Sequence, residues 1–188
     1  MKNFSLNKSK FAKMQADGIF NSIQILNKNI KLNDQYIGEM NALNVMSGLC
    51  IELYLKAFIR TTRKNAIVKG HRLENLFREI PDFLQVLIKQ HYLINFDKNA
   101  NFFKVSILIS EDKAETIPLE DKSKLENVEG AIKTLSTLFL DSRYFFEKLT
   151  DRNWITVAYY FECVKAICLS LKTVYEQYAD ADFKGRIK

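Results

Sequence analysis

Apolar residues recur every three or four positions along most of this chain, and residues that would interrupt a helix are scarce. The sequence holds only two prolines and six glycines in 188 residues. A spacing of three and four brings apolar side chains to one face of an α-helix, whereas strands alternate with a period of two. The spacing therefore predicts an all-α fold, and a chain of this length is expected to form a single domain, residues 1–188.

The expected helices begin and end at residues that favour helix termini. Asn33 or Asp34 can cap the N-terminus of the second helix, and Pro81 suits the first turn of a later one. A bend is expected near Asp141, before the segment RYFFEKL. The helical ranges that follow from the apolar spacing are 8–28, 35–63, 71–79, 81–91, 122–140 and 153–178.

Two parts of the chain are less regular in their spacing. Within residues 95–119, FFKVSILI fits a helix or, less well, a strand, whereas EDKAETIPLEDKS has the composition of a loop. We therefore expect an exposed acidic loop at residues 111–121. In the first helix, the apolar positions expected in the core are Phe11, Met14, Phe20, Ile23 and Leu26.

The formal charge of +6 is unevenly distributed along the chain. Residues 1–32 carry six lysines against Asp17 alone, and residues 54–72 carry six basic residues and no acidic one. Clustered basic charge attracts phosphate backbones, but it also occurs as a solvated lysine face that binds nothing. Both interpretations stay open from the charge alone.

Composition also indicates the compartment and the absence of a metal site. The uncharged apolar runs, such as residues 154–161, are shorter than the roughly 20 residues that a membrane-spanning helix needs, and MKNFSLNKSKFAK lacks a signal-peptide pattern. A cytoplasmic protein is therefore expected. Cys50, Cys163 and Cys168 lie in apolar helical patterns and are expected to be reduced and buried. Neither a zinc-ligand spacing nor a glycine-rich phosphate loop is present, so no metal and no cofactor is expected.

A line of charge runs along the otherwise apolar helix at residues 35–63. Glu52, Lys56 and Arg60 are four positions apart, and Glu52 sits among leucines. A carboxylate in apolar surroundings must be paired or hydrogen-bonded to stay ionised. Lys56, one turn away, is one candidate partner, and Arg143, from the apolar segment LFLDSRYFFEKL, is another across a helix interface. We expect Glu52 to pair with Arg143, directly or through Lys56, in a structural ion pair that fixes how two helices dock.

The same region resembles a known family of helical proteins. GLCIELYLKAFI, followed by a basic loop and GHRLENLF, is similar to the HEPN superfamily of prokaryotic helical domains, and DSRYFFE resembles the C-terminal half of its longer members. The resemblance covers residues 36–178 and leaves 1–32 as an extra N-terminal helix. It implies a bundle of long antiparallel helices and a homodimer. One departure from the pattern is Arg72, which follows His71 where the family usually has Asp.

The resemblance has two functional consequences. Many HEPN proteins are metal-independent ribonucleases with an Arg four to six residues before a His, and others are inactive binding modules. The Arg positions for His71, residues 64–66, hold Lys, Asn and Ala, and those for His91, residues 84–86, hold Leu, Gln and Val, so the motif is absent. The resemblance therefore implies a catalytically degenerate module that binds RNA, a nucleotide or an antitoxin-like or other protein partner, in a bacterial stress, toxin–antitoxin or phage-defence setting.

Two other functions remain open. One is a metal-independent ribonuclease with a rearranged site, for which His71, Arg72 and Arg143 are the candidate catalytic residues. The other is a purely structural subunit that buries a protein partner against its aromatic helices. If a phosphate-binding surface exists, it is expected where basic charge is densest along the chain, at Lys56, Arg60, Arg63, Lys64, Lys69 and Arg72.

Overall fold

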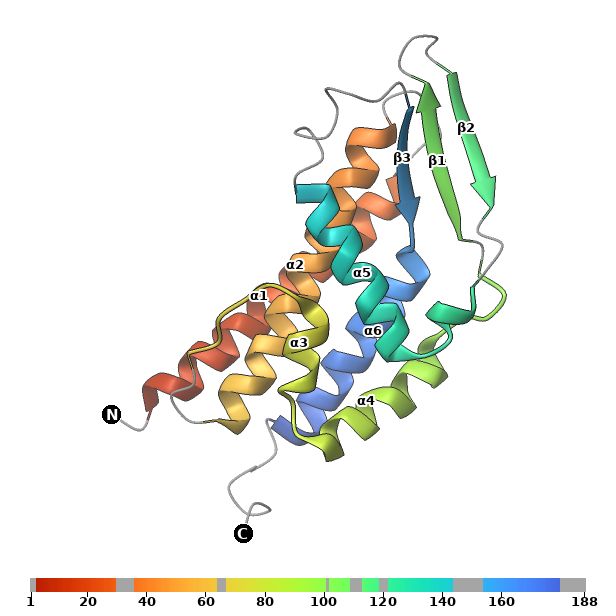
Figure 1. Ribbon diagram of the computed structural model, residues 1–188. Coiled ribbons are helices and arrows are strands. Elements are labelled where there is room, and N and C mark those ends of the chain that lie inside the picture. Colours follow the sequence, from red (N-terminus) through yellow and green to blue (C-terminus); the bar gives the residue numbers. More distant parts are fainter. Residues whose placement is uncertain are drawn as a thin grey trace.

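The computed structural model describes residues 3–29, 36–63, 67–100, 102–108, 113–118, 122–143 and 154–179 (Figure 1). The described part of the chain is mostly helical, which confirms the prediction from the apolar spacing. Its helices are α1 (Asn3–Asn29), α2 (Tyr36–Thr62), α3 (Leu73–Arg78), α4 (Asp82–Asn95), α5 (Val128–Arg143) and α6 (Phe161–Val174), with a 3-10 turn at Ser123–Leu125 and a π-helical turn at Tyr175–Ala179.

A three-stranded antiparallel sheet, which the sequence did not predict, lies at one end of the bundle (Figure 1). Its order is β2-β1-β3, and Phe103 pairs with Pro118 on one side and with Tyr159 on the other. The strands are β1 (Phe103–Leu108), β2 (Lys113–Pro118) and β3 (Trp154–Tyr159).

These strands correct three expectations. Residues 111–121 were expected to be a loop but contain β2, and the last helix begins at Phe161 because β3 precedes it. Within FFKVSILI, residues 103–108 adopt the less favoured alternative, a strand. WITVAY and FKVSIL are rich in aromatic and β-branched residues, which pack well on a pleated surface. A short apolar run gives no periodicity that separates a strand from a buried helix, so only the tertiary pairing decides between them.

Helix α2 is the central element of the bundle. It packs against α1, α3, α5 and α6, and its Tyr54, Leu55 and Phe58 side chains are completely buried. By length and composition alone, Gly38–Thr62 could cross a membrane, but most of this stretch is enclosed by the other helices. Burial of this kind is what the core helix of a bundle shows.

Helix α1 packs on α2 through a different face than the sequence predicted. Phe20 and Ile23 are buried as expected, but Phe11, Met14 and Leu26 are 55%, 59% and 44% exposed. The buried face is completed by small residues: Ser9, Ala12 and Ala16 are all buried, and the Ser9 hydroxyl donates a hydrogen bond to the Ala57 carbonyl. Small side chains let the two backbones approach closely, so the larger apolar side chains are directed away from α2.

The three cysteines are buried free thiols, as predicted. Cys50 and Cys168 face each other with their sulfur atoms 3.6 Å apart. Burial raises the pKa of the Cys163 thiol to about 12 and that of Cys168 well above its ordinary value, because the charged thiolate would lose its hydration.

We therefore expect no thiol of the folded protein to react with a chromogenic disulfide reagent at pH 8. Burial keeps all three thiols inaccessible, and the raised pKa values of Cys163 and Cys168 also keep these two in the protonated, unreactive form. Unfolding in guanidinium should release all three thiols to the reagent at once. Fast labelling of even one thiol without denaturant would contradict this arrangement.

Candidate functional site

The candidate site forms where the chain after α2 folds back along that helix. Residues 67–72 return from the end of α2 towards its middle, and Val68 packs against the core. Gly70 has a φ of 93°, a backbone conformation that side-chain-bearing residues rarely adopt, so glycine suits this turn. Helix α3 then begins with buried Leu73, whose N–H donates to the Ser136 hydroxyl of α5 at 3.1 Å. The loop is therefore held at both of its ends.

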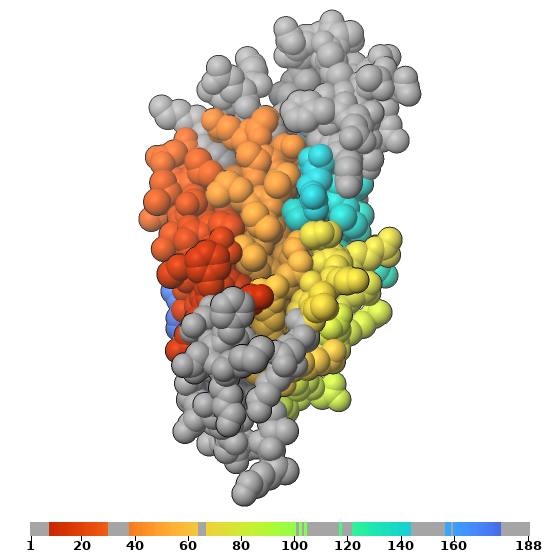
Figure 2. All heavy atoms as spheres, turned by 90° about the vertical axis from the view of Figure 1, so that its left-hand side faces the viewer, coloured from red at the N-terminus to blue at the C-terminus, as the bar shows by residue number. Residues whose placement is uncertain are grey.

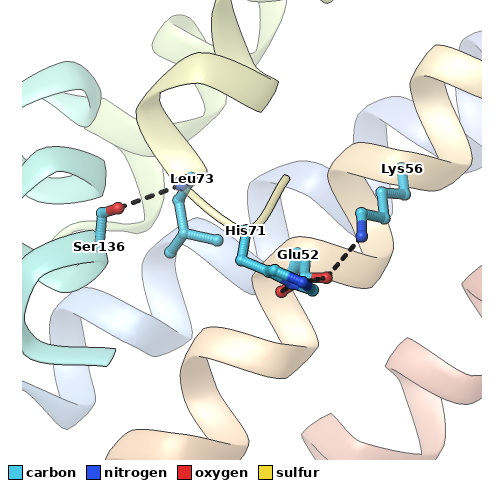
Figure 3. Close-up of polar contacts among 5 residues, drawn as sticks. All are labelled: Glu52, Lys56, His71, Leu73 and Ser136. Atoms are coloured by element: carbon cyan, nitrogen blue, oxygen red, sulfur yellow. Dashed lines mark hydrogen bonds and ion pairs between the residues drawn. The ribbon is translucent and has the colours of Figure 1, made fainter. Parts of the chain in front are cut away.

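The folded-back loop delivers His71 to the buried carboxylate of Glu52 (Figure 3). Glu52 is 4% exposed, and its Oε1 accepts from Lys56 Nζ at 2.7 Å. His71 Nδ1 lies 3.0 Å from Oε1 and 3.1 Å from Oε2 of the same carboxylate. The structure thus brings Glu52 and Lys56 together, and it adds His71 as a partner that the apolar spacing did not indicate.

Arg143 lies away from this carboxylate. Helices α5 and α2 are antiparallel: Ser136 lies beside Leu73, whereas the Ser142 carbonyl accepts from Asn41. The turn of α5 that carries Arg143 is therefore level with the start of α2, about 16 Å from Glu52 at roughly 1.5 Å of rise per residue. The exposed Arg143 guanidinium lies over the Phe139 ring, 5.5 Å from its centroid. The structure therefore brings Arg143 to neither Glu52 nor His71.

The Glu52–His71 contact fixes the orientation of the imidazole. A carboxylate only accepts hydrogen bonds, so Nδ1 carries the proton and donates it, which makes Nε2 the acceptor nitrogen of neutral His71. The His71 side chain is 55% exposed, so the ring is accessible to a ligand. A carboxylate that orients a histidine in this way is a common arrangement for a general base.

The two segments that form this contact also carry basic residues. Lys56 and Arg60 are half-buried on successive turns of α2, and Lys69 and Arg72 are exposed on the folded-back loop. Arg63 is 55% exposed and pairs with Glu79 at 3.3 Å. Figure 2 shows this face, with the C-terminal half of α2 between α1 and the segment that follows residue 67. The sixth predicted residue of this set, Lys64, lies outside the described residues.

We call the described members of this set the basic surface: Lys56, Arg60, Arg63, Lys69 and Arg72. Glu52 is the buried acidic group beside it, and it is shared by Lys56 and His71. Within the described ranges, no three His, Cys, Asp or Glu side chains gather closely enough to hold a metal ion. The arrangement therefore offers charge for binding an anion and one oriented imidazole for proton transfer.

No protein-family model matches the sequence, and no curated protein or solved structure is similar enough to count as a match. The site must therefore be interpreted from its own geometry.

Proposed function

We propose that this protein is a HEPN-like helical module that binds RNA through the basic surface, in a cytoplasmic stress or defence setting. The observation that carries the proposal is the folded-back loop at residues 67–72. Its His71 contacts Glu52, so the segment that carries Lys69 and Arg72 lies beside the turn of α2 that carries Lys56. Residues that are separated in the sequence thereby form one region of positive charge, which is what a phosphate backbone requires.

The distribution of this charge favours a polymer over a single nucleotide. The five basic residues are spread over the C-terminal end of α2 and over the loop that folds back beside it, so the charge is not confined to one turn of the chain. A single strand likewise carries its charge on several successive phosphates. As the ligand of the basic surface, we therefore favour RNA over a mononucleotide, and both of these over an acidic protein partner.

Reversing two exposed charges should weaken RNA binding. In Lys69→Glu/Arg72→Glu we expect the affinity for single-stranded RNA to fall by about tenfold or more, and the slope of log K against log salt to decrease by about one to two units. Fluorescence anisotropy at several salt concentrations measures both quantities.

The matched control is Lys28→Glu/Lys98→Glu, which changes the net charge equally at exposed positions in α1 and after α4. Its affinity should decrease only slightly, through the change in overall charge. Equal losses in the two double variants would show that the protein attracts RNA through its net charge and not through the basic surface.

The oriented imidazole supports a second candidate, metal-independent RNA cleavage. His71 Nε2 would accept the proton of a ribose 2′-hydroxyl, whose oxygen attacks the adjacent phosphorus. The bond from phosphorus to the 5′-oxygen then breaks, and this oxygen takes a proton from water, which gives a 2′,3′-cyclic phosphate and a free 5′-hydroxyl. Arg72, next to His71 and exposed, could stabilise the charge that develops on the phosphate. Arg143 has no role in this scheme because it lies far from His71.

His71→Ala tests this second candidate. Any cleavage of single-stranded RNA should persist in excess chelator and fall by about a hundredfold or more in the variant, since a general base contributes on the order of 10² to 10⁴ in rate. His91→Ala removes the only other histidine, from α4, and should cleave at the normal rate. Chelator-sensitive cleavage, or cleavage that survives in His71→Ala, would exclude this site.

A further inference from the structure

The most exposed aromatic side chain of the described residues lies on α1, at a position that the apolar spacing assigned to the core. Phe11 is 55% exposed, and Met14, one turn further on, is 59% exposed. Lys8 and Lys10 are exposed next to Phe11 in the segment KSKFAKM, residues 8–14. Single apolar residues are common on protein surfaces, so exposure alone assigns no role to Phe11. Its position relative to the basic surface is more informative.

The packing of α1 on α2 brings Phe11 level with the basic end of α2. Ser9 is hydrogen-bonded to the Ala57 carbonyl and to the Thr61 hydroxyl. Phe11 comes two residues after Ser9, and Arg60 directly precedes Thr61. Phe11 and Arg60 therefore project from adjacent turns of two helices that are in contact.

Phe11 and Arg60 also lie on the same side of this helix pair. The opposite side is marked by Tyr54 of α2, whose hydroxyl donates to Asp17 of α1 at 2.5 Å. Arg60 is six residues after Tyr54, and Phe11 is six residues before Asp17, so each lies about 120° around its helix from that bond. Because the two helices are antiparallel, both rotations lead to the same side. Figure 2 shows this side, with α1 next to the C-terminal half of α2.

We propose that Phe11 stacks against an unpaired base of the RNA strand that binds the basic surface, so that the binding site continues from α2 onto α1. This inference rests on RNA being the ligand of that surface. Sites for single strands combine basic side chains, which hold the phosphates, with aromatic rings on which bases stack. Lys8, one turn before Phe11 on the same side of α1, carries positive charge in the same direction.

The other exposed phenylalanine of the described residues has different surroundings. Phe83 is 48% exposed in the first turn of α4, where it follows Asp82. Helix α4 packs on α6, away from the basic end of α2 (Figure 1). A carboxylate beside the ring repels phosphates, so Phe83 is a poor stacking site and a suitable control.

Phe11→Ala tests the stacking contact. The dissociation constant for single-stranded RNA should rise about tenfold, whereas the slope of log K against log salt should not change, because the ring carries no charge. Phe11→Tyr keeps an aromatic face and should bind as the natural protein does. Phe83→Ala removes an exposed ring of the same kind and should also bind normally.

An abasic RNA strand of the same length separates stacking from any other effect of the substitution. It keeps every phosphate but offers no base, so the natural protein and Phe11→Ala should bind it equally. A loss in Phe11→Ala that persists on the abasic strand would overturn the proposal. Normal binding of unmodified RNA by Phe11→Ala, or an equal loss in Phe83→Ala, would overturn it as well.

The stacking contact and the basic surface fail in different ways. If Lys69→Glu/Arg72→Glu weakens binding more than its control but Phe11→Ala binds normally, RNA still occupies the basic surface and only the stacking contact is wrong. If the charge variant binds like its control, the basic surface is not the RNA site, and both proposals are overturned.

Discussion

Gly48→Ala is expected to lower the free energy of unfolding by about 2–3 kcal/mol, although alanine is the better helix former. An added Cβ at Gly48 would lie 2.2 Å from Cγ of Phe139, whereas ordinary contacts between carbon atoms are about 3.5–4.0 Å. Phe139 is buried, so its ring has little space to rotate away. Either the ring must leave its position or α5 must move off α2, and urea unfolding of the variant measures the loss.

Gly18→Ala is the matched control, because the substitution is the same but the surroundings differ. A Cβ added at Gly18 meets nothing within 4 Å, and the residue is exposed in the middle of α1. There, only the helix propensity changes, so the variant should be more stable by about 0.5–1 kcal/mol. Opposite signs at the two positions are the expected result.

The contact between Gly48 and Phe139 can also be tested by substituting Phe139. Phe139→Leu in the Gly48→Ala background should cost less than Phe139→Leu in the natural sequence, because the smaller side chain relieves the clash. Equal losses in the two backgrounds would show that Gly48 and Phe139 are not in contact.

The contact between Gly48 and Phe139 illustrates what the sequence could predict about this fold. The apolar spacing predicts both helices, since it repeats over several turns of each. It says nothing about which small residue of one helix faces which ring of the other. The same limit explains the error in α1, where Phe11 and Met14 were expected inside but Ala12 and Ala16 pack on α2. Periodicity identifies an apolar stripe, but the closeness of two backbones decides which stripe is buried.

The candidate site could also be predicted only in part: the partner of Glu52 on the same helix followed from the sequence, but the partner from the loop did not. A carboxylate among leucines requires a cation, and this argument led to Lys56 because both residues lie on one helix at a known separation. It could not lead to His71, which reaches Glu52 only because the loop folds back at Gly70. The sequence does show Gly70 followed by His71, which indicates a turn that carries a histidine. Which residue this histidine contacts depends on where the loop packs, and the sequence does not show that. Arg143 was a reasonable partner by charge, and only the pairing of α5 with α2 places it elsewhere.

Lys56→Met should destabilise the protein by about 2–4 kcal/mol, the second of the two largest effects expected here. The variant keeps the bulk of the side chain but removes the closest cation of Glu52, whose side chain is only 5% exposed. A buried carboxylate that loses its partner retains the loss of hydration without the compensating charge. His71 remains as its single described partner, so the loss should be less than for a fully isolated carboxylate.

Glu52→Leu/Lys56→Met removes both charges together and should be nearly as stable as the natural protein. Replacing a buried ion pair by apolar residues of similar size is often neutral, because neither charge then has to leave water. Denaturant unfolding of the natural protein, the two single variants and the double variant gives the coupling between the residues. A double variant that loses the sum of the single losses would contradict a direct pair.

The double variant can also distinguish a structural role of Glu52 from a role in orienting His71 for catalysis. It should fold, yet His71 would have no carboxylate to hold its ring and fix which nitrogen carries the proton. If Glu52 has only a structural role, any cleavage by the double variant should fall no further than its RNA affinity, which should decrease somewhat because Lys56 belongs to the basic surface. If Glu52 orients a functional imidazole, cleavage should fall by about tenfold or more while binding through Lys69 and Arg72 persists. Measuring cleavage and affinity on this one folded variant therefore decides why a carboxylate occupies position 52, where an apolar side chain would serve stability equally well.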